Sequence, residues 1–165
     1  KVEQKFNTDE LFEMVVNDGK KAGLLENGDL VVIMAGVPLG IAGTTNLLKG
    51  HIVGNVLVKG NGINGLCASG NLCVARTEKE ARQTFKRGDI LVVPTTSNNI
   101  LDLMKQSAGI ITEEDGPNTH AAIVGMALDI PVLVGAVSAT QILKSGTHIK
   151  LDADRGLVCN ENRED

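Results

Sequence analysis

The chain has no tryptophan, no tyrosine and only three phenylalanines among its 165 residues. Platforms that stack sugars or single-stranded nucleic acid are built from aromatic rings, so this composition argues against both. Acidic residues outnumber basic ones by 20 to 16, and the net charge of −4 disfavours binding to a polyanion. No apolar run approaches the roughly 20 residues of a membrane span, and no secretory signal opens the chain. We therefore expect neither a nucleic-acid nor a membrane partner.

Cysteine is also scarce. Cys67, Cys73 and Cys159 are odd in number and lack the spacing of metal ligands, which indicates reduced thiols in a cytoplasmic protein. We expect no metal site and no cofactor within these residues. The hydrophobic fraction of 42% is that of an ordinary folded protein. Because the sequence starts at Lys1, we expect it to be a piece of a longer protein.

Residues 1–59 contain the elements of an incomplete domain. Asn7 can cap a helix whose apolar residues recur at helical spacing. Leu30–Ala35 is a short apolar run that predicts a buried strand, and Ile52–Val58 predicts another. One helix with two or three strands is too little to close a core, so this part is interpreted as the end of a larger domain.

Residues 60–65 read GNGING and match the dinucleotide-binding pattern G-x-G-x-x-G. That pattern requires a helix to open at its third glycine, where the helix N-terminus meets a pyrophosphate. The residues that follow are rich in turn formers and do not predict a helix. The segment is therefore interpreted as a flexible linker.

Residues 66–160 alternate short strands with short helices, which predicts a compact α/β unit, and 161–165 is an acidic tail. The predicted strands are Leu72–Ala75, Ile90–Pro94, Gly109–Thr112, Val132–Val134, Thr147–Leu151 and Leu157–Cys159. The predicted helices follow Thr77, Ser97, His120 and Ser138, the last with Ile142 and Leu143 facing inward.

His120 ends a polar loop and precedes an apolar run that can form a helix. Unpaired N–H groups at a helix start attract anions, and a neutral imidazole there can accept a phosphoryl group as a nucleophile. His120 is thus the candidate catalytic residue, with Asn118, Thr119 and Ala121 as candidate phosphate-binding residues. The alternative is that this histidine is structural.

The run Glu113–Gly125, followed by Asp129–Gly135, resembles the phosphohistidine (swivelling) domain of PEP-utilising enzymes. The resemblance implies a β/β/α fold over residues 66–160 and a phosphorylated histidine at His120. Two positions depart from that pattern. Asp115 replaces a glycine, and Met126 stands where catalytic members usually have an arginine. The atom that accepts phosphate is kept, but part of its electrostatic support is missing.

Residues 28–48 resemble the closing strands of the pyruvate kinase C-terminal, effector-binding domain. The resemblance makes Gly43, Thr44, Thr45 and Asn46 candidate effector-binding residues, although these small polar residues can equally form a capped turn. Some bacterial pyruvate kinases carry an extra phosphohistidine-like domain after this point. The order of the two motifs fits that arrangement and implies that 1–59 ends the effector domain.

Three functions remain open. The first is the non-barrel C-terminal part of pyruvate kinase, which is not catalytic by itself and whose extra domain is structural or regulatory. Its parent would transfer phosphoryl from PEP to ADP in an absent domain, use Mg and K, and form a homo-oligomer. The second is a phosphohistidine carrier that takes its phosphoryl group from PEP through His120. The third is a sensor that binds PEP or another phosphorylated metabolite without covalent chemistry.

Overall fold

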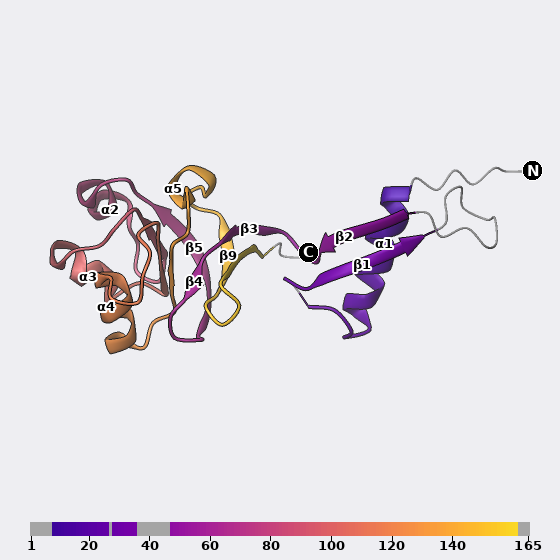
Figure 1. Cartoon of the computed structure of the whole chain (residues 1–165). Helices are drawn as coiled ribbons and strands as arrows, with labels where there is room; N and C mark the ends of the chain where they lie inside the picture. Colours follow the sequence, from indigo (N-terminus) through magenta and orange to yellow (C-terminus); the bar gives the residue numbers. More distant parts are fainter. Residues whose placement is uncertain (1–7, 27, 36–46, 162–165) are drawn as a thin grey trace, which may run out of the picture. The chain divides into compact units, whose positions relative to one another are not determined.

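The computed structural model describes residues 8–26, 28–35 and 47–161. The chain forms two compact units, Lys1–Gly54 and Asn55–Asp165, and each is described by itself (Figure 1). Asn7 and the candidate effector loop Gly43–Asn46 lie outside the described residues. The division falls at Gly54, five residues before the predicted end of the first domain at 59.

Unit 1 consists of one helix and one pair of strands. Helix α1 (Thr8–Lys21) is followed by β1 (Leu30–Ala35) and β2 (Leu47–Ile52), which pair antiparallel with Leu30 opposite Ile52. The bounds of β1 match the prediction. The predicted strand over 52–58 is divided, because β2 ends at Ile52 and a turn with Gly54 at φ +84° precedes the next strand.

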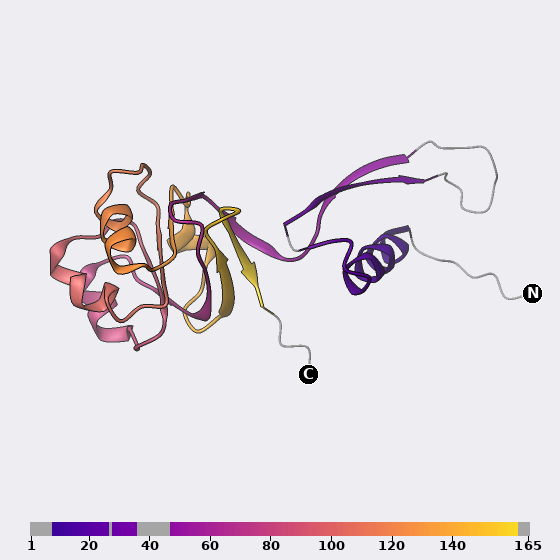
Figure 2. The same ribbon diagram turned by 90° about the horizontal axis from the view of Figure 1, so that it is seen from below.

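The β1–β2 pair has one covered face and one exposed face. Helix α1 lies along one side of the strands, and Phe12 and Val16 of this helix are buried (Figure 2). On the other side the large apolar side chains are exposed: Leu30 by 70%, Val32 by 59%, Met34 by 66% and Leu48 by 70%. The expectation of a buried strand at 30–35 is therefore wrong for this face of the strand, since within unit 1 no described element packs on it.

Unit 2 is built on eight strands in the order β3-β10-β9-β5-β6-β7-β8-β4. The strands are β3 (Val56–Lys59), β4 (Asn61–Gly62), β5 (Cys67–Val74), β6 (Ile90–Val93), β7 (Gly109–Thr112), β8 (Val132–Val134), β9 (His148–Asp152) and β10 (Leu157–Asn160). Strands β5 to β8 run parallel, whereas the other pairings are antiparallel. Strand β5 pairs with β9 along its first half and with β6 along its second.

The parallel strands separate two hydrophobic cores. On one face they pack against the helical elements, which are α2 (Glu78–Thr84), the 3₁₀ turn η1 (Asn98–Ile100), α3 (Leu101–Met104) and α4 (His120–Leu128). On the other face they pack against β3, β9, β10 and α5 (Ala139–Ile142). Figure 1 shows α2, α3 and α4 together on one side of the sheet. This β/β/α layering confirms the predicted fold class.

Residues 60–65 contribute a strand to unit 2 and do not form a free linker. Asn61 and Gly62 pair with β8, and the Gly60 N–H donates to the Gly156 carbonyl over 3.0 Å. A Cβ at Gly62 would lie 1.6 Å from the Ala153 carbonyl oxygen. These glycines are therefore needed for close backbone contact between distant segments, which explains a composition that resembles a linker.

Two helix starts differ in how well their caps follow the sequence pattern. The Thr77 hydroxyl accepts from the Glu80 N–H at the start of α2, as expected for an N-cap. Ser138 precedes α5 but makes no side-chain cap, and the Glu113 carboxylate accepts from the Thr140 N–H instead. Leu143 points inward as predicted, whereas Ile142 is exposed.

Candidate functional site

The candidate site lies where the parallel strands β6, β7 and β8 end. Backbone hydrogen bonds join the three loops that follow these strands: the Glu114 N–H donates to Pro94, and the Gly135 N–H donates to Glu114, each over 2.9 Å. In α/β sheets ligands bind at the carboxyl ends of the strands. The histidine loop is therefore held firmly at the edge of the sheet where a functional site is expected.

Thr119 starts helix α4 and places His120 at its first position. The Thr119 hydroxyl accepts from the Ala122 N–H over 3.3 Å and donates to the Gly116 carbonyl over 3.0 Å. Gly116 adopts φ +120°, a conformation that side chains rarely permit. Of the candidate phosphate-binding residues, Asn118 is exposed, whereas Thr119 is buried and its hydroxyl serves the cap.

Both ring nitrogens of His120 have hydrogen-bond partners. The Thr96 hydroxyl lies 2.8 Å from Nδ1, and the Asn98 carbonyl oxygen Oδ1 lies 3.0 Å from Nε2. With the Asn98 amide oxygen facing the ring, Nε2 donates to this oxygen and Nδ1 accepts from the Thr96 hydroxyl. This arrangement corresponds to the Nε2–H tautomer, in which the lone pair of Nε2 is not available.

Each of the three carboxylates before His120 has a partner other than the imidazole. Glu113 accepts from Thr140, and Glu114 accepts from the Thr95 hydroxyl over 2.6 Å. Asp115 accepts from the Asn61 side-chain amide over 2.9 Å and from the N–H of the next residue over 2.8 Å. The acidic run therefore ties the loop to its neighbours.

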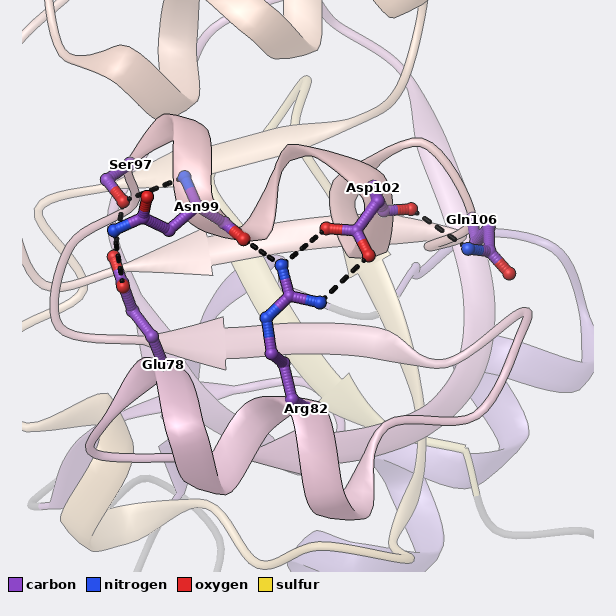
Figure 3. A network of polar contacts seen from close by, with 6 residues as sticks. All are labelled: Glu78, Arg82, Ser97, Asn99, Asp102 and Gln106. Atoms are coloured by element: carbon purple, nitrogen blue, oxygen red, sulfur yellow. Dashed lines mark hydrogen bonds and ion pairs between the residues drawn. The ribbon is translucent and has the colours of Figure 1, made fainter.

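A network of polar contacts joins α2 to the segment that carries Asn98 (Figure 3). Glu78 accepts from the Ser97 hydroxyl and from the Asn99 side-chain amide, the latter over 3.1 Å. Arg82 donates to the Asn99 backbone carbonyl and makes a two-pronged ion pair with Asp102 at 3.0 and 2.9 Å. The residues on both sides of Asn98 are thus held by one helix, α2.

Hydrogen bonding lowers the pKa values of two carboxyl groups in this network. The bond from the Ser97 hydroxyl, assisted by Asn99, lowers the pKa of Glu78 below its usual value. The bonds from the Arg82 guanidinium likewise lower the pKa of Asp102. Both groups are therefore ionised at neutral pH, and the network is complete there.

Sequence reasoning found His120 but missed Thr96, Asn98 and Glu78. The signal for Thr96 was its position just after a predicted strand, since neighbouring parallel strands bring their carboxyl ends together. Met126 and Ile123 of α4 are about half exposed, so Met126 leaves an apolar surface where a cation was expected.

Within the described ranges, no group of three His, Cys, Asp or Glu side chains could hold a metal ion. Among the described residues, no helix is both long and apolar enough to cross a membrane.

Two family models match the chain in sequence order. Residues 1–51 match "Pyruvate kinase, alpha/beta domain", and residues 85–156 match "PEP-utilising enzyme, mobile domain". The second match includes His120, Thr96 and Asn98, whereas the first covers α1, β1 and all but the last residue of β2.

Several curated pyruvate kinases align with nearly the whole chain. The enzyme of Geobacillus stearothermophilus is 45% identical over 151 residues, and that of Lactobacillus delbrueckii subsp. bulgaricus is 43% identical over 152 residues. Each alignment covers 92% of this chain but 26% of the relative. The chain therefore spans about a quarter of the length of these relatives.

A solved structure shares the fold of about two thirds of this chain. The crystal structure of Thermococcus kodakaraensis aconitase X in its holo form superposes with a TM-score of 0.52 at 25% identity. The match covers 64% of this chain and 98% of that chain. The fold thus also occurs in a protein with a different name, which is why the function has to be inferred from the site.

Proposed function

The chain belongs to the pyruvate kinase family, whose C-terminal region it matches, and we propose that it serves the whole enzyme without transferring a phosphoryl group itself. The observation that carries this proposal is the extent of the alignments, which cover 92% of the chain and 26% of the relatives. Transfer of phosphoryl from PEP to ADP, with its Mg and K ions, is assigned to the remaining length of the parent enzyme.

Unit 2 is proposed to be structural or regulatory in that enzyme. Its histidine is retained, but both nitrogens of the His120 ring are engaged by Thr96 and Asn98. Met126, on the same helix, provides no positive charge for a phosphoryl group. A histidine that accepts phosphate needs a free nitrogen lone pair and cationic support, and both features are weak in unit 2.

Replacing His120 in the full-length parent enzyme tests this assignment. We expect His120→Ala to keep kcat/KM for PEP and ADP within about twofold of the wild-type value, because no reacting atom is removed. Asn118→Ala, which changes an exposed residue of the same loop, is the matched control. A tenfold or larger loss confined to His120→Ala would reject the proposal, with about 1.4 kcal/mol of lost transition-state stabilisation.

The second candidate function is a phosphohistidine carrier, and one contact favours it. The Thr96 hydroxyl at Nδ1 orients the ring at the start of α4, where helix N–H groups could hold phosphate oxygens. Such a carrier would take the phosphoryl group of PEP onto the ring and pass it to a second acceptor. It requires an acid-labile, base-stable phosphate on His120 after incubation with PEP and the parent enzyme.

We also propose that the parent enzyme is a cytoplasmic homo-oligomer. Support comes from the exposed apolar face of the β1–β2 pair in unit 1, because contiguous apolar faces of this kind mark surfaces that are covered in an assembly or in a larger domain. Sedimentation of the full-length enzyme, compared at several protein concentrations, tests the assembly. A mass equal to one subunit at all concentrations would contradict it.

A further inference from the structure

The Asn98 side-chain oxygen lies within hydrogen-bond distance of Nε2 of His120, whereas Thr96 contacts the other ring nitrogen, Nδ1. Asn98 belongs to the turn η1 and His120 to α4, so the contact joins two elements that are 22 residues apart in sequence. Asn98 is exposed and His120 is partly buried. Because Asn98 is exposed, it does not fill the core, and its hydrogen bond to the His120 ring is the contact to explain.

The residues on both sides of Asn98 are held in place by side-chain hydrogen bonds from helix α2. Glu78 holds the side chains of Ser97 and Asn99, and Arg82 holds the Asn99 carbonyl (Figure 3). The Ser97 hydroxyl also accepts from the Asn99 N–H over 3.2 Å and so caps the turn. These contacts limit where the Asn98 side chain can reach, and its oxygen lies 3.0 Å from Nε2.

The two partners of the ring differ in what they can do. A threonine hydroxyl either donates to a bare Nδ1 or accepts from Nδ1–H, so Thr96 is compatible with both tautomers. The Asn98 oxygen only accepts, so it is compatible with a proton on Nε2 alone. The choice between the two tautomers therefore depends on Asn98.

We propose that Asn98 is a positioning residue that fixes His120 as the Nε2–H tautomer and thereby keeps the Nε2 lone pair out of nucleophilic chemistry. The proposal rests on the proposed function, since it supplies a reason why a retained histidine is not a phosphoryl acceptor. Glu78 and Arg82 act through Asn98 by holding its turn in place. Thr96 orients the ring but does not decide where the proton lies.

The tautomer can be measured directly by nitrogen NMR of the full 165-residue chain with ¹⁵N-labelled histidine. At about pH 9, where imidazoles are neutral, the wild type should show a protonated, pyrrole-type Nε2 and a bare, pyridine-type Nδ1 for His120. In Asn98→Ala the two signals should move toward each other, because losing one neutral hydrogen bond changes the tautomer ratio by about fivefold. His120→Gln assigns the signals.

Three variants separate this role from a merely structural one. Asn98→Asp keeps an accepting oxygen and should restore the Nε2–H signals. Thr96→Val removes the hydroxyl at Nδ1 and should leave the proton on Nε2. Asn71→Ala removes the asparagine whose Oδ1 lies 3.1 Å from Nδ1 of His148, so it makes the same change at another histidine and should leave His120 untouched.

Reactivity provides a second readout. Phosphoramidate transfers its phosphoryl group to an imidazole nitrogen: its own P–N bond breaks, a new N–P bond forms on the ring, and ammonia leaves with the ring proton. Asn98→Ala should label His120 at Nε2 about fivefold faster than the wild type, in proportion to the tautomer that bares this nitrogen. Labelling of His148 in the same sample is the internal reference.

An unchanged tautomer in Asn98→Ala, or a wild-type ring protonated on Nδ1, would overturn the proposal. So would equal labelling rates in wild type and Asn98→Ala. These outcomes differ from a failure of the proposed function, which would appear as lost PEP-to-ADP turnover in full-length His120→Ala. The NMR measurement reports on the ring alone, and the turnover measurement reports on the enzyme.

Discussion

The two units of this chain differ in how completely they bury their own sheets. In unit 2 the parallel strands have one core against helices and another against strands β3, β9 and β10. In unit 1 the β1–β2 pair has α1 on one face and exposed apolar side chains on the other. Unit 2 therefore carries the interactions of a complete domain, whereas unit 1 presents a surface suited to further structure.

Glycine-to-alanine substitutions should show the largest difference in stability between the two units. A Cβ at Gly62 in β4 would meet the Ala153 carbonyl oxygen at 1.6 Å, whereas a Cβ at Gly50 in β2 has no neighbour closer than 3.9 Å. We expect Gly62→Ala to lower the free energy of unfolding of unit 2 by about 4 kcal/mol, and Gly50→Ala to change unit 1 by less than about 0.5 kcal/mol. Amide hydrogen exchange during urea titration measures both units separately.

Equal effects of the two glycine variants would mean that unit 1 is as tightly packed around its strands as unit 2. A silent Gly62→Ala would also mean that close backbone contact does not account for the glycines of segment 60–65. In that case the segment would have room to behave as the linker that its composition predicts.

Truncating apolar side chains should show the same difference in stability between the two units, with a smaller effect. Leu133 of β8 is fully buried, so Leu133→Ala should destabilise unit 2 by about 3 kcal/mol through lost contacts and a cavity. Val32 of β1 is 59% exposed, and Val32→Ala should change the stability of unit 1 by less than about 0.5 kcal/mol. Urea unfolding followed by circular dichroism provides the measurement. A large loss in Val32→Ala would show that its face is covered in solution.

Local patterns predicted much of the fold. The strands Leu30–Ala35, Gly109–Thr112 and Val132–Val134 have the expected bounds, because short apolar runs between turn formers carry that information locally. Strand β4 was missed, since two residues in a glycine-rich segment have no apolar pattern and pair with a strand some 70 residues later. The same limit applied to Ser138, whose expected capping role is taken by the distant Glu113.

The site was predictable in part for the same reason. His120 and its loop form a continuous motif, so they were visible in the sequence. Thr96 lies 24 residues earlier and Asn98 lies 22 residues earlier, and both reach the ring because β6 and β7 are parallel neighbours. No local pattern marks an asparagine that accepts from an imidazole. The contact between Asn98 and His120 could therefore not be predicted from the sequence.

Acid should lower the free energy of unfolding of unit 2, by less than Gly62→Ala or Leu133→Ala does. The pKa of Glu78 is lowered in the folded state by its bonds from Ser97 and Asn99. A depressed carboxyl pKa contributes stability that is fully present above the ordinary value of 4.5 and is lost as the pH falls through the folded value. The stability of unit 2 should thus decline over that acidic range, and less so in Glu78→Gln.

Thermal unfolding of the wild type and Glu78→Gln between neutral pH and about pH 3 measures how steeply the stability of each protein falls with pH. Asp102, whose pKa is lowered in the same direction by Arg82, remains in Glu78→Gln and accounts for a common background. Identical slopes in the two proteins would mean that Glu78 does not hold the turn. Unit 1 provides an internal reference, because neither carboxyl group belongs to it.

Residues 85–156 of unit 2 match the mobile domain of PEP-utilising enzymes, and we propose that the His120 ring in this domain is held unreactive. Intact-mass analysis of the full-length enzyme under basic conditions, after turnover with PEP, tests this claim most directly. We predict that the wild-type enzyme gains no phosphoryl group on His120. A stable gain of one phosphoryl group that is lost in acid and absent from His120→Ala would contradict it.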